Sequence, residues 1–244
     1  MLTRNQMQYN SINLSQLNFK KSYCFKTYNK TLGLLHTKNK KYDAFIDIYT
    51  TKLLNKNNIA LGQETFLLTK NKLSYGMNID ILPEYQQKGY NLGELLRLSS
   101  IIMMLENKIK VFKIFSLPEA LFFHNKYKFT SDIDDYDEMI STLENSLTNC
   151  KNKKEYNDIY NESNAILDAS KKAKDQENLH LDLMKKTNDL INRYFNKISN
   201  KKDEYKNHPF KFGIHMKLTM ENILKNKDFF NELFKKHKIN YVIK

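Results

Sequence analysis

The chain has few cysteines and no long uninterrupted apolar run. Cys24 and Cys150 are the only cysteines among 244 residues, too few for a disulfide framework, and no Cys-x-x-Cys or His/Cys spacing predicts a metal site. We therefore expect no metal and a reducing, cytoplasmic setting. The longest apolar stretch, residues 95–105, is interrupted by Arg97 and two serines. The N-terminal residues lack an apolar core of signal-peptide length, so neither a membrane span nor a signal peptide is predicted.

Arginine is also scarce, although the chain is strongly basic. The 40 Lys and Arg residues outnumber the 27 Asp and Glu residues, for a formal net charge of +13. A charge of this size favours non-specific contact with polyanions. Arginine occurs only at Arg4, Arg97 and Arg193, whereas specific recognition of phosphates and bases favours its planar fork. We interpret the lysines as a solvated surface and expect no specific nucleic-acid partner; a nucleic-acid-associated protein is the alternative.

The length and the hydrophobic content set the size of the expected fold. A chain of 244 residues, 41% of them hydrophobic, can bury a substantial core. Residues 1–40 are polar, and we expect at most one strand there, near residues 23–27. Residues 42–53, 59–69 and 73–82 are β-rich runs separated by short polar turns. Their composition predicts three consecutive antiparallel strands.

The stretch from residue 79 to residue 96 organises the rest of the chain. It reads IDILPEYQQKGYNLGELL, an alternating strand followed by Pro83, a turn that contains Gly89, and a helix. The backbone N–H groups in the first turn of a helix have no partner within the helix, and the helix dipole adds partial positive charge there. Strand, turn and helix N-terminus in this order predict a binding site for a phosphate or pyrophosphate.

The turn in this stretch resembles a known family motif. The sequence QQKGYN, from Gln86 to Asn91, is similar to the Q/R-x-x-G-x-G/A turn with which the GCN5-related N-acetyltransferases, the GNAT superfamily, hold the pyrophosphate of acyl-CoA. Asn91 departs from the pattern, but asparagine tolerates positive φ better than other non-glycine residues. The resemblance implies a binding site for acetyl-CoA or another acyl-CoA. Its residues would be Ile79, Ile81, Leu82, Gln86, Gln87, Lys88, Gly89, Tyr90, Asn91, Leu92 and Gly93.

A second motif follows downstream. Residues 109–116 form a predicted strand, and Pro118 begins a short helix in the favoured first-turn position. Residues 120–129 read ALFFHNKYKF, which is similar to the A-x-x-F-Y-x-K-x-G-F sequence of the same family. His124 replaces the usual tyrosine and Lys128 replaces the glycine. An unrelated strand–helix–strand unit with a chance glycine turn is the alternative interpretation of both motifs.

The order and the separation of the two motifs imply a fold class. They resemble GNAT proteins, so we expect an α/β (α+β) fold with a mixed, mostly antiparallel sheet. In that family the strands corresponding to residues 73–82 and 109–116 run parallel and splay apart in the centre of the sheet, with acyl-CoA in the gap. Residues 210–218 alternate like a last strand, and Thr219 then caps a helix.

Residues 136–206 interrupt this pattern. Apolar residues recur there at helical spacing without any proline, which predicts two or three amphipathic helices in a hairpin or small bundle. We therefore predict a GNAT-like acyl-CoA-binding domain of residues 1–135 and 207–244 and a helical insertion of residues 136–206. The insertion either acts as an interaction arm through which the chain dimerises or braces the core.

An acidic run marks the start of this helical segment. Its members are Asp132, Asp134, Asp135, Asp137 and Glu138. A metal site is one interpretation of the run. Acids that complement the dipole at a helix N-terminus are the other, and we favour it.

The resemblance also implies which residues carry out the chemistry. Acyl transfer from CoA to an amine requires donors for the thioester, a base for the ammonium and an acid for the leaving thiolate. His124 occupies the place of the family's tyrosine acid, although a buried helix histidine is more often structural. Tyr75 falls where some members have a glutamate base, and tyrosine is a poor base at neutral pH. Glu64, on the preceding strand, is a carboxylate candidate or else a solvent-facing strand residue.

The implied function is an acyl-CoA-dependent N-acyltransferase. Its acceptor, a small-molecule or protein amine, is not identified by the sequence. The departures at Tyr75, Asn91, His124 and Leu117, which replaces a carbonyl-binding asparagine of the family, leave a second hypothesis open. In that hypothesis the chain is a catalytically silent module that binds CoA or a protein partner.

Overall fold

The computed structural model divides into two compact units. It describes residues 24–27, 30–41, 46–54, 59–86, 91–147, 154–173, 176–199, 208–237 and 239–244. Unit 1 comprises Met1–Lys110 and Ile223–Lys244, and unit 2 comprises Val111–Asn222. We describe each unit by itself.

The sheet of unit 1 is antiparallel throughout. Its strands are β1 (Cys24–Thr27), β2 (Lys30–Lys41), β3 (Ile46–Leu54), β4 (Ala60–Thr69) and β5 (Leu73–Ile81), and each pairs with the next. The three strands predicted from residue 42 onward are thereby confirmed as β3, β4 and β5. The expectation of at most one strand in residues 1–40 is wrong, because β2 is a second one. Its sequence, KTLGLLHTKNKK, lacks regular alternation, but both β1 and β3 hydrogen-bond to its backbone.

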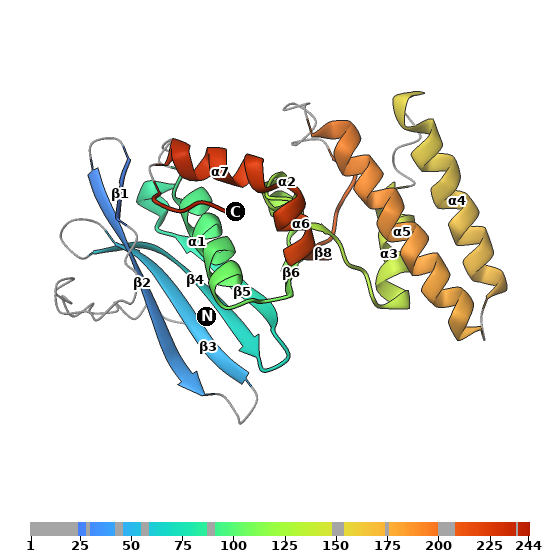
Figure 1. The fold of residues 1–244 in the computed structure, drawn as a ribbon. Coiled ribbons are helices and arrows are strands. Elements are labelled where there is room, and N and C mark those ends of the chain that lie inside the picture. The colour runs from blue at the N-terminus through green and yellow to red at the C-terminus, as the bar shows by residue number, and fades with distance from the viewer. Residues whose placement is uncertain are drawn as a thin grey trace. The chain divides into compact units, whose positions relative to one another are not determined.

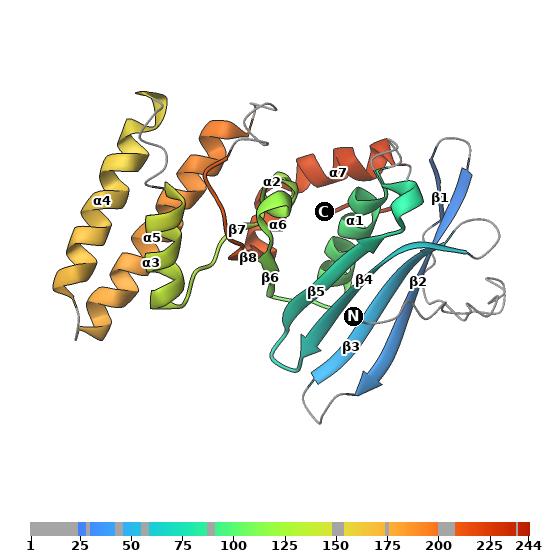
Figure 2. The same cartoon turned by 180° about the vertical axis from the view of Figure 1, so that it is seen from behind.

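Helix α1 (Leu92–Glu106) covers one face of this sheet and packs on β3, β4 and β5 (Figure 1). Its apolar residues lie on more than one side of the helix, and Leu95, Leu96, Leu98 and Ile101 are all fully buried. Such a helix is stabilised by its surroundings rather than by a single amphipathic stripe. Figure 2 shows the opposite face of β3, β4 and β5, over which no described helix of unit 1 lies.

Two short helices end the chain. Thr219 caps α6 (Met220–Lys225) as predicted, because its Oγ1 accepts a hydrogen bond of 3.0 Å from the backbone N–H of Asn222. Helix α7 (Lys227–Lys236) belongs to unit 1 and buries Phe230 and Phe234. The side chain of Asn231 in α7 bonds both the N–H and the C=O of Ile243, at 2.8 and 3.0 Å. These bonds hold the C-terminal residues against α7.

The sheet of unit 2 is short and also antiparallel. Strand β8 (Ile214–Thr219) lies between β6 (Val111–Ser116) and β7 (Thr130–Ser131). The 3₁₀ turn η3 (Pro118–Ala120) and helix α2 (Leu121–Lys126) follow β6, which confirms the predicted strand, the start at Pro118 and the short helix. One face of this sheet forms a core, in which the rings of Phe112 and Phe129 pack edge to face at 5.8 Å.

Three helices complete unit 2. They are α3 (Tyr136–Asn145), α4 (Asn157–Lys172), which follows the 3₁₀ turn η5 (Lys154–Tyr156), and α5 (Glu177–Ile198), and they pack on one another (Figure 1). The prediction of two or three amphipathic helices is confirmed. The predicted domain boundaries at residues 136 and 206 stay a prediction, since unit 2 joins these helices with β6, β7 and β8.

The elements bear out the predicted class, a mixed α/β fold whose strand pairs within each unit are antiparallel. The parallel, splayed pairing expected for β5 and β6 would join the two units and stays a prediction. Among the described residues, no helix combines the length and the apolar character that a membrane span requires.

Candidate functional site

The connection from β5 to α1 begins with a tight turn. The backbone N–H of Leu82 donates to the carbonyl of Leu61 at 3.0 Å, so the pairing with β4 continues past the end of β5. A 3₁₀ turn, η2 (Pro83–Tyr85), then reverses the chain. The Nε2 of Gln86 donates back to the carbonyl of Ile81 at 2.7 Å and braces the turn. The predicted cofactor-binding residues Gln87, Lys88, Gly89 and Tyr90 lie outside the described residues.

Asn91 enters helix α1 in the left-handed conformation. Its φ is 53° and its ψ is 34°, which confirms that this asparagine adopts the positive φ expected for the glycine or alanine of the motif. Its carbonyl accepts the N–H of Leu95 at 3.1 Å, the first hydrogen bond of the helix. The next residues, Leu92 and Gly93, form the start of the helix and present their N–H groups at its N-terminus.

The first turn of α1 is held by the end of α7. Glu94 is only 4% exposed, and its Oε1 accepts a hydrogen bond of 2.8 Å from the Nζ of Lys236 and also contacts the Nε2 of His237. The positive charge of Lys236 offsets that of the Glu94 carboxylate. Sequence analysis did not find this contact, because its members are 142 residues apart along the chain.

A hollow of about 220 Å³ lies beside the C-terminal end of β5. Its lining residues are Ala60, Gly62, Gln63, Asp80, Ile81, Leu82 and Pro83. A Cβ atom at Gly62 would approach the carbonyl oxygen of Asp80 to 2.7 Å and the Cδ1 of Ile81 to 2.6 Å. The glycine is therefore needed for the close packing of β4 against β5 at this hollow. The volume suits a segment of a ligand, because complete small-molecule sites span about 300–1,000 Å³.

Strand β5 contains a β-bulge at Met77. Thr65 of β4 pairs with Asn78 and Phe66 pairs with Gly76, so Met77 has no partner in β4. Its side chain is 62% exposed. A bulge takes the extra residue out of the hydrogen-bonded ladder, bends the strand locally and is common next to active sites.

Glu64 is buried between β4 and α1. It is 1% exposed, its Oε1 accepts a 3.0 Å hydrogen bond from the Nη1 of Arg97, and its Oε2 accepts one from Ser100. The alternative of a solvent-facing strand residue is thus wrong, because α1 covers this face of the sheet. Burial raises the pKa of Glu64, and the charge of Arg97 and the hydrogen bond from Ser100 only partly counteract that rise.

Tyr75 lies on the other face of the same strand pair. It pairs with Leu67, whereas Glu64 pairs with Ile79. Residues 64 and 67 are an odd number of positions apart in β4, so their side chains, and those of their partners, point to opposite faces. The structure therefore does not bring together the two bases that the family resemblance implies. Tyr75 is 40% exposed.

His124, the candidate acid, lies in unit 2. It is in α2, 9% exposed, and its ring is 5.2 Å from the ring of Phe123 and 5.6 Å from that of Phe129. A histidine in such an aromatic environment contributes to packing. Its proposed part in catalysis stays a prediction.

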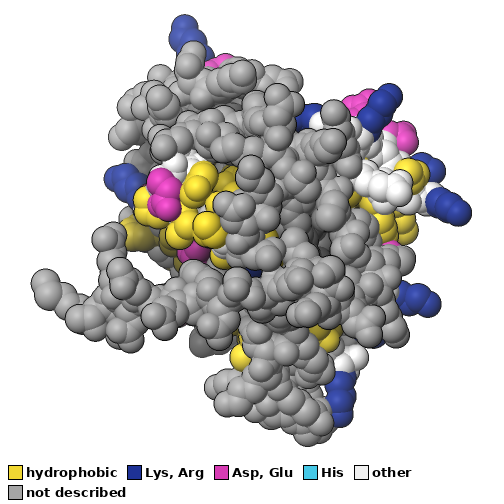
Figure 3. Space-filling view, turned by 90° about the vertical axis from the view of Figure 1, so that its left-hand side faces the viewer, with side chains coloured by type: hydrophobic (Ala, Val, Ile, Leu, Met, Phe, Trp, Pro, Cys, Tyr) yellow, Lys and Arg dark blue, Asp and Glu magenta, His cyan; other side chains and the backbone are white. Residues whose placement is uncertain are grey.

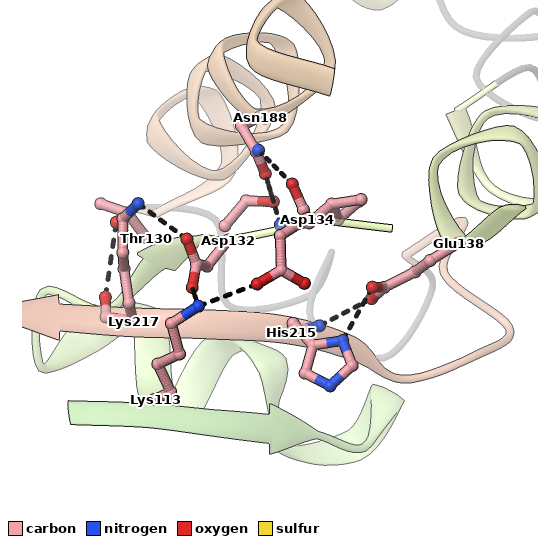
Figure 4. Close-up of polar contacts among 10 residues, drawn as sticks. Lys113, Thr130, Asp132, Asp134, Glu138, Asn188, His215 and Lys217 are labelled. Carbon is pink, nitrogen blue, oxygen red and sulfur yellow. Dashed lines mark hydrogen bonds and ion pairs between the residues drawn. The ribbon is translucent and has the colours of Figure 1, made fainter. Parts of the chain in front are cut away.

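The acidic run at the start of α3 serves as a helix cap and as a set of ion-pair partners. Asp135 accepts the N–H of Glu138 at 2.8 Å and caps α3, in agreement with the interpretation we favoured. Asp132 pairs with Lys217 at 2.7 Å and with Lys113 at 2.9 Å (Figure 4). Where the structure describes the chain, no group of three or more His, Cys, Asp or Glu side chains is arranged to hold a metal.

Lys113 joins this cluster to Asp134. The hydrogen bond from Lys113, 2.9 Å long, holds the pKa of the Asp134 carboxyl below its ordinary value. Partial burial works to lower the pKa of Lys113, but its hydrogen bonds to Asp134 and Asp132 outweigh that effect and raise the pKa. Both shifts keep the groups charged.

The basic surface does not gather into one patch where it can be seen. In Figure 3 the Lys and Arg side chains of the described residues stand apart from one another, and some lie beside Asp or Glu side chains. This arrangement on that face agrees with the interpretation of the lysines as solvated charges.

Comparison with known proteins gives structural neighbours but no sequence relative. No protein-family model matches the chain, and no curated protein matches it significantly. Among solved structures, it is similar to a GNAT-family acetyltransferase from Staphylococcus aureus Mu50, with 14% identity over 36% of this chain and 56% of that chain and a TM-score of 0.32. It is also similar to Tetrahymena GCN5, with 15% identity over 38% of this chain and 57% of that chain and a TM-score of 0.33.

A third neighbour is a GNAT-family acetyltransferase from Elizabethkingia anophelis with acetyl-CoA bound. The identity is 14% over 41% of this chain and 78% of that chain, with a TM-score of 0.33. The chain spans little more than half the length of the Staphylococcus and Tetrahymena proteins. Because each match is partial and its identity low, these neighbours do not assign an activity to this chain.

Proposed function

We propose that this chain binds acetyl-CoA or another acyl-CoA and transfers the acyl group to an amine. The observation that carries the proposal is the connection from β5 to α1, where Asn91 in the left-handed conformation leads into the first turn of α1. This conformation is the one expected for the last position of the motif that begins at Gln86. It places backbone N–H groups at a helix N-terminus, where an anion binds favourably.

The first turn of α1 suits a pyrophosphate. The N–H groups of Leu92 and Gly93 belong to the part of a helix that has no partner one turn earlier. The helix dipole adds partial positive charge at the same end. Glu94, the acid of this turn, is buried and paired with Lys236, so its charge does not oppose an approaching anion.

The end of β5 suits the pantetheine arm and the thioester. An extended ligand segment can hydrogen-bond along a strand much as an added strand does. The hollow beside Gly62 and Ile81 gives such a segment room. The bulge at Met77 removes one backbone N–H from the ladder with β4. A donor of this kind stabilises a carbonyl oxygen as negative charge develops on it.

The chemistry requires an acid and a base from this chain. Bound acyl-CoA would supply an activated thioester and a thiolate leaving group. His124 is the acid that the second motif implies, and histidine exchanges protons near neutral pH. Tyr75 and Glu64 are the implied bases, and they point to opposite faces of the β4–β5 pair. At most one of them can therefore act on a given ligand, and the ion pair with Arg97 already engages Glu64.

Calorimetric titration of the full chain with acetyl-CoA tests the proposal, and Asn91 offers a matched pair of variants. Asn91→Gly keeps access to positive φ and removes no side-chain cap, since Asn91 makes none. Asn91→Val places a β-branched residue in the left-handed region, a strain of about 1–3 kcal/mol. We expect the parent and Asn91→Gly to bind acetyl-CoA and Asn91→Val to bind it at least about tenfold more weakly.

Two results would contradict the proposal. One is a folded parent protein that shows no heat of binding at high micromolar acetyl-CoA. The other is an Asn91→Val variant that is folded and binds like the parent, because the turn would then not hold the pyrophosphate. Circular dichroism of each variant separates a loss of binding from a loss of folding.

A catalytically silent CoA-binding or protein-interaction module is the second candidate. The opposite orientation of Tyr75 and Glu64 favours it, because the implied bases do not converge. In this candidate the helices α3, α4 and α5 contact a protein partner or a second copy of the chain. Thiol release from acetyl-CoA in the presence of polyamines, peptides and aminoglycosides distinguishes the two, since only an acyltransferase releases CoA thiol as an amine is consumed.

A further inference from the structure

An accessible histidine–carboxylate pair lies on the sheet of unit 2. His215 is in β8, and the carboxylate of Glu138, from α3, reaches it from above the strand (Figure 4). The Oε1 of Glu138 accepts the backbone N–H of His215 at 2.9 Å, and its Oε2 lies 2.7 Å from the ring Nδ1. The two contacts fix both the strand and the ring relative to the carboxylate.

This geometry determines how the imidazole is protonated. A carboxylate that accepts from Nδ1–H holds the neutral ring in the tautomer with its lone pair on Nε2. No described residue hydrogen-bonds to Nε2, and 47% of the side chain is exposed. The Glu138 side chain, in contrast, is 15% exposed. The buried member therefore orients the ring, and the exposed member presents a proton acceptor to solvent.

The surroundings of Nε2 are aromatic. Phe115 of β6 pairs with His215 across the strands, so both side chains lie on the same face, with ring centres 5.1 Å apart. Phe115 is 54% exposed and Phe212 is 56% exposed. Gly213 makes this packing possible, because a Cβ there would approach the Phe115 ring to 2.7 Å and the Ser116 carbonyl to 2.6 Å.

The charged groups on this face carry an excess of negative charge. The carboxylates of Glu138, Asp132 and Asp134 face the ammonium groups of Lys113 and Lys217, and these five are the charged groups around His215. A neutral imidazole leaves one net negative charge in the cluster. Negative charge together with an exposed aromatic face attracts an organic cation.

We propose that His215, oriented by Glu138, binds the ammonium group of the acceptor and is the base that deprotonates it. The inference rests on the proposed N-acyltransferase function and assigns its acceptor class, an aliphatic amine with an apolar stem. His215 is the catalytic residue, and Glu138 acts through it as a positioning residue.

The proton and the bonds are accounted for as follows. The lone pair of Nε2 takes one proton from R–NH₃⁺, which leaves R–NH₂ and an imidazolium stabilised by Glu138. The amine nitrogen attacks the thioester carbonyl, a C–N bond forms and the C–S bond breaks. The second nitrogen proton goes to the departing CoA thiolate, and the imidazolium returns its proton to solvent.

Amine binding can be measured without any turnover. Butane-1,4-diamine is titrated into the full chain at pH 8, and the ring signals of His215 are followed by NMR, with butane-1,4-diol as the uncharged comparison. We expect the diamine, and not the diol, to shift these signals saturably. His215→Gln should weaken diamine binding, measured by calorimetry, about tenfold or more, as for loss of a hydrogen bond to a charged group.

A control histidine and a change of pH sharpen this test. His180→Gln removes a ring that stacks on Tyr136 at 3.9 Å and whose Nε2 lies 2.8 Å from the Ala173 carbonyl, so diamine binding should stay at the parent level. Histidine ordinarily changes charge between about pH 5 and 8. At pH 5 a protonated His215 would repel the diamine, so affinity should fall in the parent and change less in His215→Gln.

The inference is overturned if the diamine leaves the His215 signals unmoved, or if His215→Gln binds the diamine as the parent does. Titration of the same sample with acetyl-CoA separates the two proposals. A protein that binds acetyl-CoA but not the diamine retains the proposed function and refutes the role of His215. A protein that binds the diamine but not acetyl-CoA keeps an amine site and refutes the acyltransferase.

Discussion

The two units each contain a cluster of carboxylates and cations, and the clusters differ in access to water. In unit 1, Glu64 and Arg97 are each 1% exposed, and Ser100 completes the carboxylate's bonds. In unit 2, Lys113 and Lys217 keep 28% and 39% of their side chains exposed, and they share the carboxylate of Asp132.

The difference separates charges that hold an element in place from charges that can meet a ligand. Removing one partner of a buried pair leaves an uncompensated charge in a medium of low dielectric constant. An exposed pair is screened by water and contributes little to stability. The cluster of unit 1 therefore fixes α1 on β4, whereas the cluster of unit 2 remains available for binding near His215.

The largest effect is expected for Arg97→Met, which removes the cation and leaves the buried Glu64 carboxylate unpaired. We expect a loss of about 3–5 kcal/mol in the free energy of unfolding, measured by urea denaturation. The double variant Arg97→Met, Glu64→Leu removes both charges and should recover most of that loss. A loss below about 1 kcal/mol for the single variant would show that the pair is not buried as described.

A smaller effect is expected for Glu64→Gln, and it depends on pH. Because the folded protein raises the pKa of Glu64 above its ordinary 4.5, the folded state binds the proton more tightly than the unfolded state. The free energy of unfolding of the parent should therefore fall as pH rises from about 4.5 to the raised pKa, by at most about 1.4 kcal/mol per pH unit.

Glutamine carries no titrating proton, so Glu64→Gln should lack this fall. Urea denaturation of the parent and of the variant at several pH values measures the difference between them. A difference that stays constant with pH would mean that the raised pKa is wrong.

The smallest effect is expected for Lys217→Met on the exposed cluster. Asp132 would keep its 2.9 Å ion pair with Lys113, so a change of about 0–1 kcal/mol in the free energy of unfolding is expected. The same urea denaturation measures it. A loss as large as that of Arg97→Met would remove the distinction between the two clusters.

Local sequence pattern predicted the elements whose hydrophobic periodicity is clear. Strands β3, β4 and β5, helix α1 and the cap at Thr219 were all indicated by alternation, helical spacing or capping chemistry. Strand β2 was missed because its lysine-rich end lacks alternation, and its pairing depends on β1 and β3.

The candidate site was predictable only where it is local. The positive φ of Asn91 follows from the tolerance of asparagine for that region and from its place before a helix. The burial of Glu64 depends on Arg97, 33 residues away, and the orientation of His215 depends on Glu138, 77 residues away. No local pattern marks such pairs, since only the folded chain brings their side chains together.

The central claim, that the N-terminus of α1 holds the pyrophosphate of acyl-CoA, is tested most directly by the amide NMR signals of Leu92 and Gly93. Titration of the labelled full chain with CoA should shift both signals saturably, and desulfo-CoA, which keeps the pyrophosphate, should shift them in the same way. Signals of Leu92 and Gly93 that do not move at saturating CoA, while other amides do, would place the cofactor elsewhere and contradict the claim.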